Sequence, residues 1–282
     1  MTTTVREALG TLTVLGVLAP TAAGQTAQTA PAAAPHDVTA LAKETQNPVG
    51  NVISVPFQFN FNGGGGLEDE SLFTLNVQPV IPFKLTDGWN LIARTIIPIS
   101  SAPGPDGSRY SGVGDINQQF FFTPAKPGAI IWGAGPVLSL PTSTAVPTTT
   151  GTWGAGLGAV VVKMTGPFVL GGLVTQVWPM ADTGGEPEVD LFTLQPFLNF
   201  NFGPGYALGF APVITANWDG APGDRWTVPL GIGLSRTTVF NGRPMSLAAQ
   251  YYHNLERPDA GPGNQLRLVM TLLFPPARGH RD

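Results

Sequence analysis

The sequence predicts an all-β protein, a transmembrane, antiparallel, up-and-down β-barrel of about 12 strands preceded by a short N-terminal helix. Three observations support this prediction. The chain is poor in charge, its long uncharged runs contain too many prolines for helices, and its apolar residues alternate with polar ones at a period of two.

The composition is apolar and excludes several classes of protein. Charged residues make up 11% of the 282-residue chain, whereas an ordinary soluble domain carries about 25%. The 43% of hydrophobic residues excludes intrinsic disorder, although the chain contains 36 glycines and 28 prolines. A net charge of −4 argues against nucleic acid as a partner. The absence of cysteine excludes a disulfide, a thiolate zinc site and an iron–sulfur cluster.

The two longest uncharged runs, residues 127–162 and 191–218, exceed the roughly 20 residues that a transmembrane helix needs. Both runs are interrupted by several prolines. Each proline inside a helix costs about 3 kcal/mol or more, because it removes a hydrogen bond and clashes with the preceding turn. A closed β-barrel is the other structure that satisfies every backbone polar group in lipid. The runs therefore favour membrane-spanning strands.

A period of two is clearest in residues 51–62, 72–83, 191–202 and 265–274. In the first of these segments Phe57, Phe59 and Phe61 alternate with Gln58, Asn60 and Asn62. Such alternation is typical of a strand between an apolar and a wet surface. The polar positions hold mainly Asn, Gln and Thr rather than the Lys and Glu of a soluble sheet, and this composition indicates a lumen.

Turn signals divide residues 51–275, the predicted barrel, into twelve candidate strands joined by two kinds of connection. The short connections are residues 84–88, 124–128, 164–167, 203–205 and 241–243, and they alternate with longer ones near 63–70, 100–112, 141–150, 180–188, 219–224 and 256–263. Short periplasmic turns and longer outer loops are typical of barrels in the outer membrane of Gram-negative bacteria. This arrangement predicts that both termini are periplasmic.

Six prolines fall inside the proposed strands, where a closed barrel has no free edge for a residue that lacks an N–H group. They predict bulges, strand ends or shifts of register at Pro79, Pro98, Pro136, Pro196, Pro212 and Pro229.

Charge and tryptophan are placed as a barrel in lipid would require. Twelve of the eighteen acidic residues lie in or beside the longer loops. One interpretation is that charged residues are generally found in loops. The other is that these acidic residues bind divalent cations, which bridge to the headgroups of outer-membrane lipid and lipopolysaccharide. All six tryptophans fall near proposed strand ends and predict interfacial belts: Trp89 and Trp132 toward the turns, and Trp153, Trp178, Trp218 and Trp226 toward the loops.

The first fifty residues predict three segments before the barrel. Residues 1–24 have the apolar stretch and small-residue site of a secretory signal peptide. Residues 25–50 combine a linker rich in Ala, Pro and Thr with a short helix, residues 37–48, for which Asp37 is the expected N-cap. The helix is either part of a mobile periplasmic tail or a plug inside the lumen. Residues 276–282 form a C-terminal tail.

Several charged and amide side chains are predicted to line the lumen, because a charge facing lipid at the membrane midplane costs about 2–4 kcal/mol. They either rigidify a filled interior or set the selectivity of a narrow aqueous path. The predicted lining residues are Arg94, Asp115, Arg236, Arg267, Asn76, Gln78, Gln195 and Asn199.

Catalytic chemistry has little support in the sequence. The three histidines share no metal-ligand spacing, and the sequence predicts neither a metal site nor a cofactor. A hydrolase site at the barrel rim, with His253 and Asn254 as a half-site, is the weakest of three hypotheses. The first hypothesis is passive passage of small solutes, and the second is a structural barrel that does not conduct.

Seven runs of sequence resemble a known family of bacterial outer-membrane barrels. The family's members are described as transporters and are similar to barrels associated with meta-pathway phenol degradation, although some carry the label neuromedin U. The runs are LAKETQNPV (41–49), ISVPFQFNFN (53–62), LNVQPVIPF (75–83), WNLIARTIIPI (89–99), GVGDINQQFFFTPAKPG (112–128), WTVPLGIGL (226–234) and QLRLVMTLLFP (265–275).

The resemblance covers residues 41–275 and implies a Gram-negative outer-membrane barrel that takes up small hydrophobic or aromatic compounds. It supplies no binding residues. Such a barrel is expected to meet the barrel-assembly machinery during insertion. Here Phe274 is followed by PPARGHRD, whereas the assembly signals of these barrels generally end on the aromatic residue.

Overall fold

The computed structural model describes residues 37–64, 71–104, 108–144, 151–180 and 190–274. They belong to one compact unit, Pro35–Asp282, which is distinct from Met1–Ala34. The predicted signal peptide, most of the linker, the C-terminal tail and seven of the twelve loop acids lie outside the described residues.

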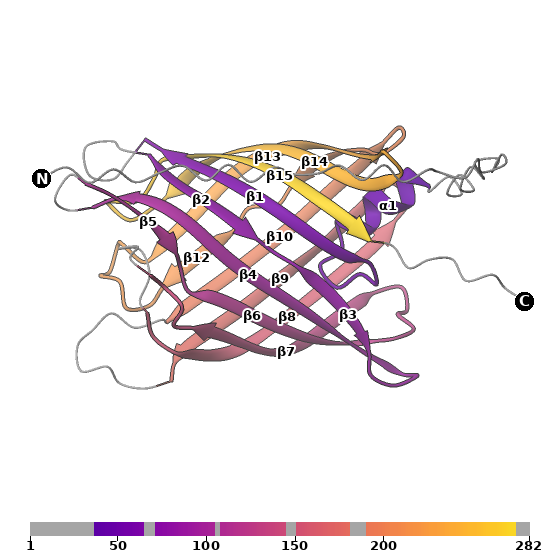
Figure 1. The fold of residues 1–282 in the computed structure, drawn as a ribbon, viewed down its shortest axis with the longest axis horizontal. Coiled ribbons are helices and arrows are strands. Elements are labelled where there is room, and N and C mark those ends of the chain that lie inside the picture. Colours follow the sequence, from indigo (N-terminus) through magenta and orange to yellow (C-terminus); the bar gives the residue numbers. More distant parts are fainter. Residues whose placement is uncertain (1–36, 65–70, 105–107, 145–150, 181–189, 275–282) are drawn as a thin grey trace, which may run out of the picture. The chain divides into compact units, whose positions relative to one another are not determined.

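One helix and fifteen strand segments make up the described chain (Figure 1). In order these are α1 (Val38–Thr45), β1 (Ile53–Gly63), β2 (Leu72–Val77), β3 (Val80–Lys84), β4 (Trp89–Pro103), β5 (Arg109–Val113), β6 (Ile116–Pro124), β7 (Ile131–Leu140), β8 (Gly154–Thr165), β9 (Phe168–Pro179), β10 (Leu191–Phe202), β11 (Tyr206–Phe210), β12 (Ile214–Asn217), β13 (Trp226–Phe240), β14 (Arg243–Glu256) and β15 (Asn264–Phe274).

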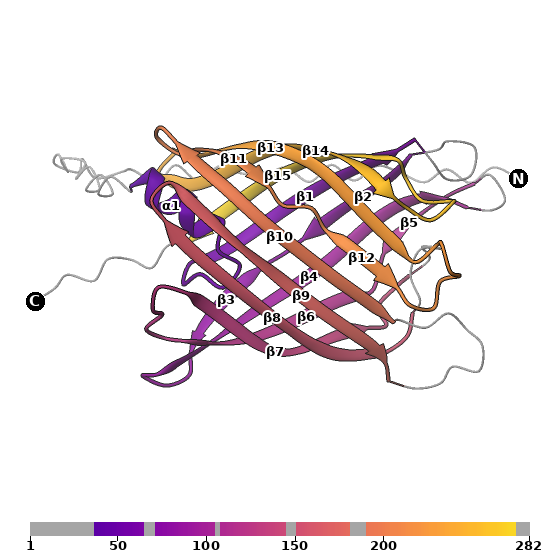
Figure 2. The same cartoon turned by 180° about the vertical axis from the view of Figure 1, so that it is seen from behind.

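The segments form twelve antiparallel strands that close into a barrel, as the sequence predicts (Figures 1 and 2). Three strands are interrupted and appear as the pairs β2/β3, β5/β6 and β11/β12. The first and last strands complete the ring, because β1 pairs with β15 from Ile53↔Phe274 to Gly63↔Asn264. The sheet therefore has no free edge, as a barrel in lipid requires.

The two faces of the barrel are inverted relative to a soluble protein. On the outer face of β13, Leu230 and Ile232 are 53% and 54% exposed. Polar side chains turn inward, and Asn60 and Arg267 are each 4% exposed. The strands thus give the barrel an apolar outer surface and carry polar side chains into the lumen, as in barrels that face lipid.

Connections alternate between the two ends of the barrel, and the five predicted as short lie at the end where α1 lies (Figure 1). They are shorter than the others with one exception, because residues 125–130 form a longer connection than residues 104–108. The turn between β13 and β14 is the tightest. Asn241 and Gly242 adopt φ angles of 48° and 75°, which is the left-handed conformation that a two-residue hairpin of type I′ requires.

All six prolines predicted to disturb the ladder lie at irregular positions. Pro79 and Pro212 lie in the breaks between β2 and β3 and between β11 and β12, and a shift of register separates Val228 from Pro229. Pro98 faces the break between β5 and β6, and Pro196 faces the break around Pro212. Pro136 lies where pairing between β6 and β7 lapses. Each missing N–H group therefore falls where the ladder is already open.

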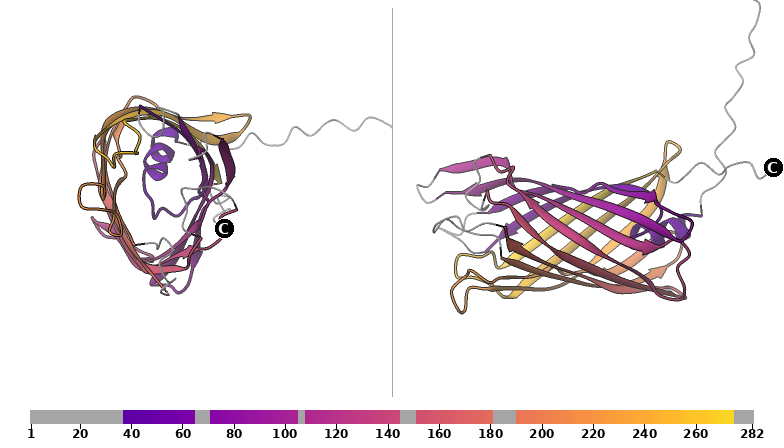
Figure 3. Two further views of the ribbon diagram at one scale, coloured as in Figure 1. Left: turned by 90° about the vertical axis from the view of Figure 1, so that its left-hand side faces the viewer. Right: turned by 90° about the horizontal axis from the view of Figure 1, so that it is seen from below.

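The predicted helix is present as α1 and begins at the predicted cap. The Asp37 carboxylate accepts hydrogen bonds from the backbone N–H groups of Thr39 (2.9 Å) and Ala40 (3.2 Å). Viewed along the barrel, α1 lies within the ring of strands (Figure 3, left). In the part of the chain that the structure describes, no helix is long and apolar enough to span a membrane.

The apolar outer face predicts that the cost of an outward-facing charge depends on its depth in the membrane. Replacing the exposed, mid-strand Ile232 with arginine should lower the free energy of unfolding in lipid vesicles by about 2–4 kcal/mol, because the charge would face the hydrocarbon. The same substitution at exposed Phe240, on the same face at the end of β13, should cost only about 0–1 kcal/mol. Equal costs at the two depths in denaturant titrations would contradict this orientation.

Candidate functional site: the lumen

Two cavities occupy the interior of the barrel. The loop-side cavity has a volume of about 370 Å³ and reaches from Asn62 and Leu191 toward the middle of the strands. The turn-side cavity has a volume of about 220 Å³ and extends to Thr45 and Gln46 at the end of α1. Five residues line both cavities and are called the shared ring: Gln58, Gln78, Arg94, Gln195 and Arg267.

A chain of hydrogen bonds joins the two arginines of the shared ring through three amides. Arg94 Nη2 donates to Gln78 Oε1 at 2.8 Å, and Gln78 Nε2 donates to Gln58 Oε1 at 3.4 Å. Gln58 Nε2 and Arg267 Nε both donate to Asn60 Oδ1, at 3.1 and 3.3 Å. The network runs from Arg94 in β4 through Gln78, in the break between β2 and β3, to β1 and then to Arg267 in β15. Neighbouring strands therefore hold both guanidinium groups in place.

Arg267 is held more firmly than Arg94. Beyond Asn60, its guanidinium donates to Ala211 O (3.1 Å), Gln250 Oε1 (3.4 Å) and Gln265 Oε1 (2.8 Å). It also lies over the ring of Tyr252, with Cζ 4.7 Å from the ring centroid. Arg94 has one other partner, Gln119 Oε1, at 3.4 Å.

The lumen is electropositive at this level. Arg94 and Arg267 are the charged residues among the described side chains that line the two cavities. Among the described residues, no carboxylate lies within 4.0 Å of either guanidinium. The amides satisfy hydrogen bonds but carry no net charge, so the positive charge of the ring is not neutralised by these partners.

The structure brings six of the eight sequence-predicted lining residues to the cavities. Arg94, Arg267, Gln78 and Gln195 belong to the shared ring. Asn76 lines the loop-side cavity and Asn199 the turn-side cavity, and these placements come from the alternation of the strands that carry them.

Asp115 and Arg236 differ from that expectation. Asp115 lies in the break between β5 and β6. Its carboxylate accepts hydrogen bonds from the backbone N–H groups of Thr142, Ser143 and Gly151. It therefore organises the connection after β7. Arg236 is exposed on the outer face of β13, next to the turns, and its guanidinium lies 5.0 Å from the Tyr206 ring centroid. At a strand end the long side chain can reach the interface, so its charge need not face inward.

Several lumen residues were absent from the predicted set. Gln58, Asn60, Gln119 and Gln250 all contact an arginine or a member of the connecting network. The same alternation that identified Asn76 places them on the inner face of their strands. A signal for them was therefore present in the sequence.

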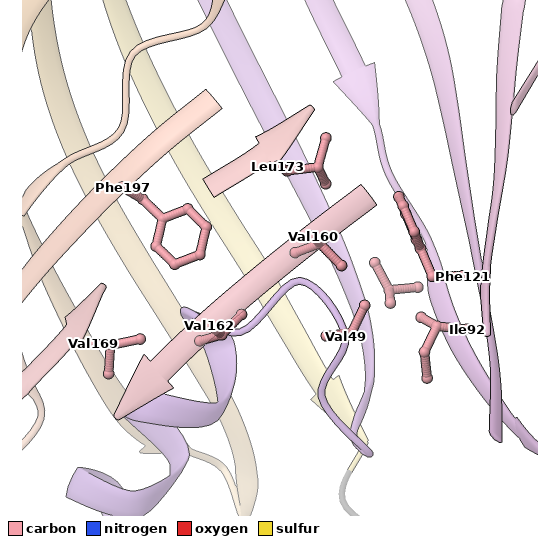
Figure 4. Packing of buried hydrophobic residues seen from close by; sticks show 9 residues of the cluster. Val49, Ile92, Phe121, Val160, Val162, Val169, Leu173 and Phe197 are labelled. Atoms are coloured by element: carbon pink, nitrogen blue, oxygen red, sulfur yellow. The ribbon is translucent and has the colours of Figure 1, made fainter. Parts of the chain in front are cut away.

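The segment that follows α1 packs into an apolar cluster inside the barrel (Figure 4). Val49 is 3% exposed and points toward side chains from several strands. The other members of the cluster are Val80, Ile92, Phe121, Val160, Val162, Val169, Leu173 and Phe197. The turn-side half of the lumen is thus partly filled by the chain's own N-terminal segment.

Polar contacts fix the same segment to the barrel. Gln46 and Asn201 exchange hydrogen bonds of 3.0 and 3.1 Å, and Lys43 Nζ donates to Gly166 O at 2.9 Å. Asn90 donates to Asn51 Oδ1 at 3.1 Å. Burial raises the pKa of the Glu44 carboxyl, since desolvation disfavours its charged form.

The six tryptophans lie at or next to strand ends, and five of them are exposed: Trp89, Trp132, Trp153, Trp178 and Trp218. Trp89 and Trp132 make an edge contact near the turns, with centroids 5.9 Å apart. Trp218 and Trp226 do the same near the loops, at 5.6 Å. Their positions are those that interfacial belts would take.

Among the residues that the structure describes, the ring of His253 has one hydrogen-bond partner, the side chain of Asn264. His253 is exposed on the outer face of β14, and its Nδ1 lies 2.9 Å from the amide oxygen of Asn264. A nucleophile would require a hydroxyl within hydrogen-bond reach of the ring. Within the described ranges, no group of three or more His, Cys, Asp or Glu side chains is placed to hold a metal ion.

Comparison with known proteins identifies the class of fold. No protein-family model and no curated protein matches the chain. Among solved structures, the COG4313 outer membrane channel from Pseudomonas putida F1 is similar, with a TM-score of 0.60 and 20% identity over 79% of this chain and 94% of that chain.

Two further solved structures show weaker similarity. The CymD monoaromatic hydrocarbon channel gives a TM-score of 0.42 at 9% identity, covering 86% of this chain and 92% of that chain. Outer membrane phospholipase A from Escherichia coli gives 0.44 at 12%, covering 79% and 97%. The protein has the fold of an outer-membrane β-barrel, as the similarity to the COG4313 channel shows.

The anchoring of the N-terminal segment can be tested with a buried charge. The substitution Val49→Asp should release residues 38–51, because an unpaired carboxylate would enter the apolar cluster. Trypsin cleavage after Lys43 should accelerate at least about tenfold, equivalent to about 1.4 kcal/mol of docking free energy. Ala40→Asp, at an exposed position of α1, is the matched control and should leave the cleavage rate unchanged.

The docking of the segment should also depend on pH. A carboxyl whose pKa is raised in the docked state binds a proton more tightly there than in the released state. Docking should therefore be strongest below the ordinary pKa of glutamate and weaken as pH rises through the raised value. Glu44→Gln should remove this dependence, as measured by hydrogen exchange of residues 38–51 relative to the parent protein. An identical pH response in both proteins would contradict the assignment to Glu44.

Proposed function

We propose that the protein is a passive outer-membrane channel for small solutes, whose path runs through the two cavities and the shared ring. The observation that carries this proposal is a polar, partly hollow lumen inside a closed and outwardly apolar barrel. Two inward arginines and a chain of hydrogen-bonded amides beside two cavities favour a polar path over a barrel that serves only as an anchor. The fold shared with an outer-membrane channel supports the same function.

We propose that α1 and residues 46–51 form a plug that narrows the turn-side end of the path. Val49 in the apolar cluster and the Gln46–Asn201 pair are the contacts that support this role. Hydrophobic or aromatic solutes, which the family resemblance implied, are supported by apolar side chains in the loop-side cavity: Ile96, Leu173, Leu191 and Val213.

The setting of the channel is also proposed. The exposed apolar face and the tryptophans at both strand ends support outer-membrane lipid, with lipopolysaccharide, as the surrounding medium. The described chain begins and ends at the short-turn end of the barrel, which supports periplasmic termini. A signal peptide in residues 1–24 and insertion by the barrel-assembly machinery complete this proposal.

Conductance in a planar bilayer tests the channel function. The full-length protein should give discrete current steps, and deletion of residues 37–50 should enlarge them because the plug is removed. Heat-modifiable mobility on a gel shows in both cases that the barrel is folded. Silence from both folded proteins would overturn the proposal and favour the structural barrel, for which the filled turn-side half of the lumen is the supporting observation.

A further inference from the structure

We propose that Arg94 and Arg267 form an anion-binding site in the lumen that takes the carboxylate of a small organic acid with an apolar body. This inference deepens the proposed channel function by naming its solute class. The binding site itself can be tested whether or not the barrel conducts.

The charge balance of the lining is the first argument. The described residues around the two cavities contribute two arginines and no acidic side chain. Both guanidinium groups are bound by neutral amide or carbonyl oxygens. Leaving a buried charge without a counter-charge is unfavourable, and an anion entering the lumen would remove that penalty. A cationic solute would increase it.

The hydrogen bonds divide the roles of the two arginines. Arg267 donates four hydrogen bonds and rests on Tyr252, so its guanidinium is largely committed to the barrel. Arg94 donates two hydrogen bonds to described residues, one of them as long as 3.4 Å, out of the five N–H groups that a guanidinium offers. Arg94 therefore has donors left for a ligand, and Arg267 supplies a fixed positive field.

The shape of the guanidinium favours a carboxylate. Its planar fork matches the two oxygens of a carboxylate through parallel hydrogen bonds, which a spherical halide cannot make. The loop-side cavity, at about 370 Å³, lies within the roughly 300–1,000 Å³ range of small-molecule sites.

The lining of this cavity also contains apolar side chains. Leu173, Leu191 and Val213 line it together with the ring arginines. A solute that contacts both kinds of side chain has an anionic group at one end and a hydrocarbon or aromatic body at the other. Benzoate is the simplest such probe, and benzyl alcohol presents the same ring without the charge.

Equilibrium binding tests the site without reference to conduction. The detergent-purified, full-length protein is titrated with benzoate, and the dissociation constant is measured by saturation-transfer NMR. Arg94→Gln should weaken benzoate binding at least about fivefold, equivalent to about 1 kcal/mol, with little effect on benzyl alcohol. Arg94→Lys keeps the charge but loses the planar guanidinium. Its dissociation constant for benzoate should lie between those of the parent protein and of Arg94→Gln. Arg236→Gln removes a charge from the outer face, and benzoate binding should be unchanged.

Ion selectivity in bilayers provides the second measurement. In a gradient of potassium chloride, the reversal potential should show preference for chloride over potassium, and Arg94→Gln should reduce that preference while Arg236→Gln should not. Heat-modifiable mobility verifies the fold of each variant. Equal benzoate affinity in the folded parent, Arg94→Gln and Arg236→Gln proteins would overturn the anion site even if the barrel conducts. Benzoate binding that depends on Arg94 in a silent barrel would support the site and overturn the channel.

Discussion

Pairing between β1 and β15 is the constraint on which the rest of the structure depends. A strand with a free edge would leave backbone polar groups unpaired in lipid, at several kcal/mol each, so the first and last strands must meet. Their register sets Asn60 opposite Arg267, and the register of β14 with β15 sets Gln250 on its other side. The same seam that closes the barrel therefore places two of the five residues of the shared ring, Gln58 and Arg267. A shift of one residue along it would turn Arg267 toward the hydrocarbon.

The architecture was largely predictable from the sequence because lipid imposes a simple rule. From Ile53 to Phe61 and from Leu266 to Phe274 every second residue is apolar, and this alternation assigns Asn60 and Arg267 to the lumen. Arg236 shows where that rule was set aside. It shares a face with Leu230, Ile232 and Leu234, so period two places it outside, whereas the cost of a charge in lipid predicts the inside. That cost falls toward the strand ends, and at this position the alternation decides.

Other parts of the site could not be found from a pattern. The role of Asp115 depends on a break in its strand, where alternation gives no face, and on a connection that folds back over it. The destination of Val49 depends on contacts with residues more than forty positions away, such as Ile92, which no local signal encodes. The prolines within the strands were partly informative. Each predicted an irregularity in the sheet, but not whether it would be a break, a bulge or a lapse in pairing.

Polar and charged side chains stabilise a barrel less than apolar ones would if the interior only had to be filled. Apolar side chains could fill the same space, and replacing buried charges by well-packed hydrophobic groups is often neutral or stabilising by about 1–4 kcal/mol. The turn-side half of this lumen does use that solution, with Phe121, Val160 and Phe197 packed around Val49. Since one chain contains both solutions, the arginines and amides of the shared ring are not a general requirement of folding. Their retention beside two cavities is explained if water and solute pass between them, because a wet path removes most of the desolvation cost that a sealed interior would impose.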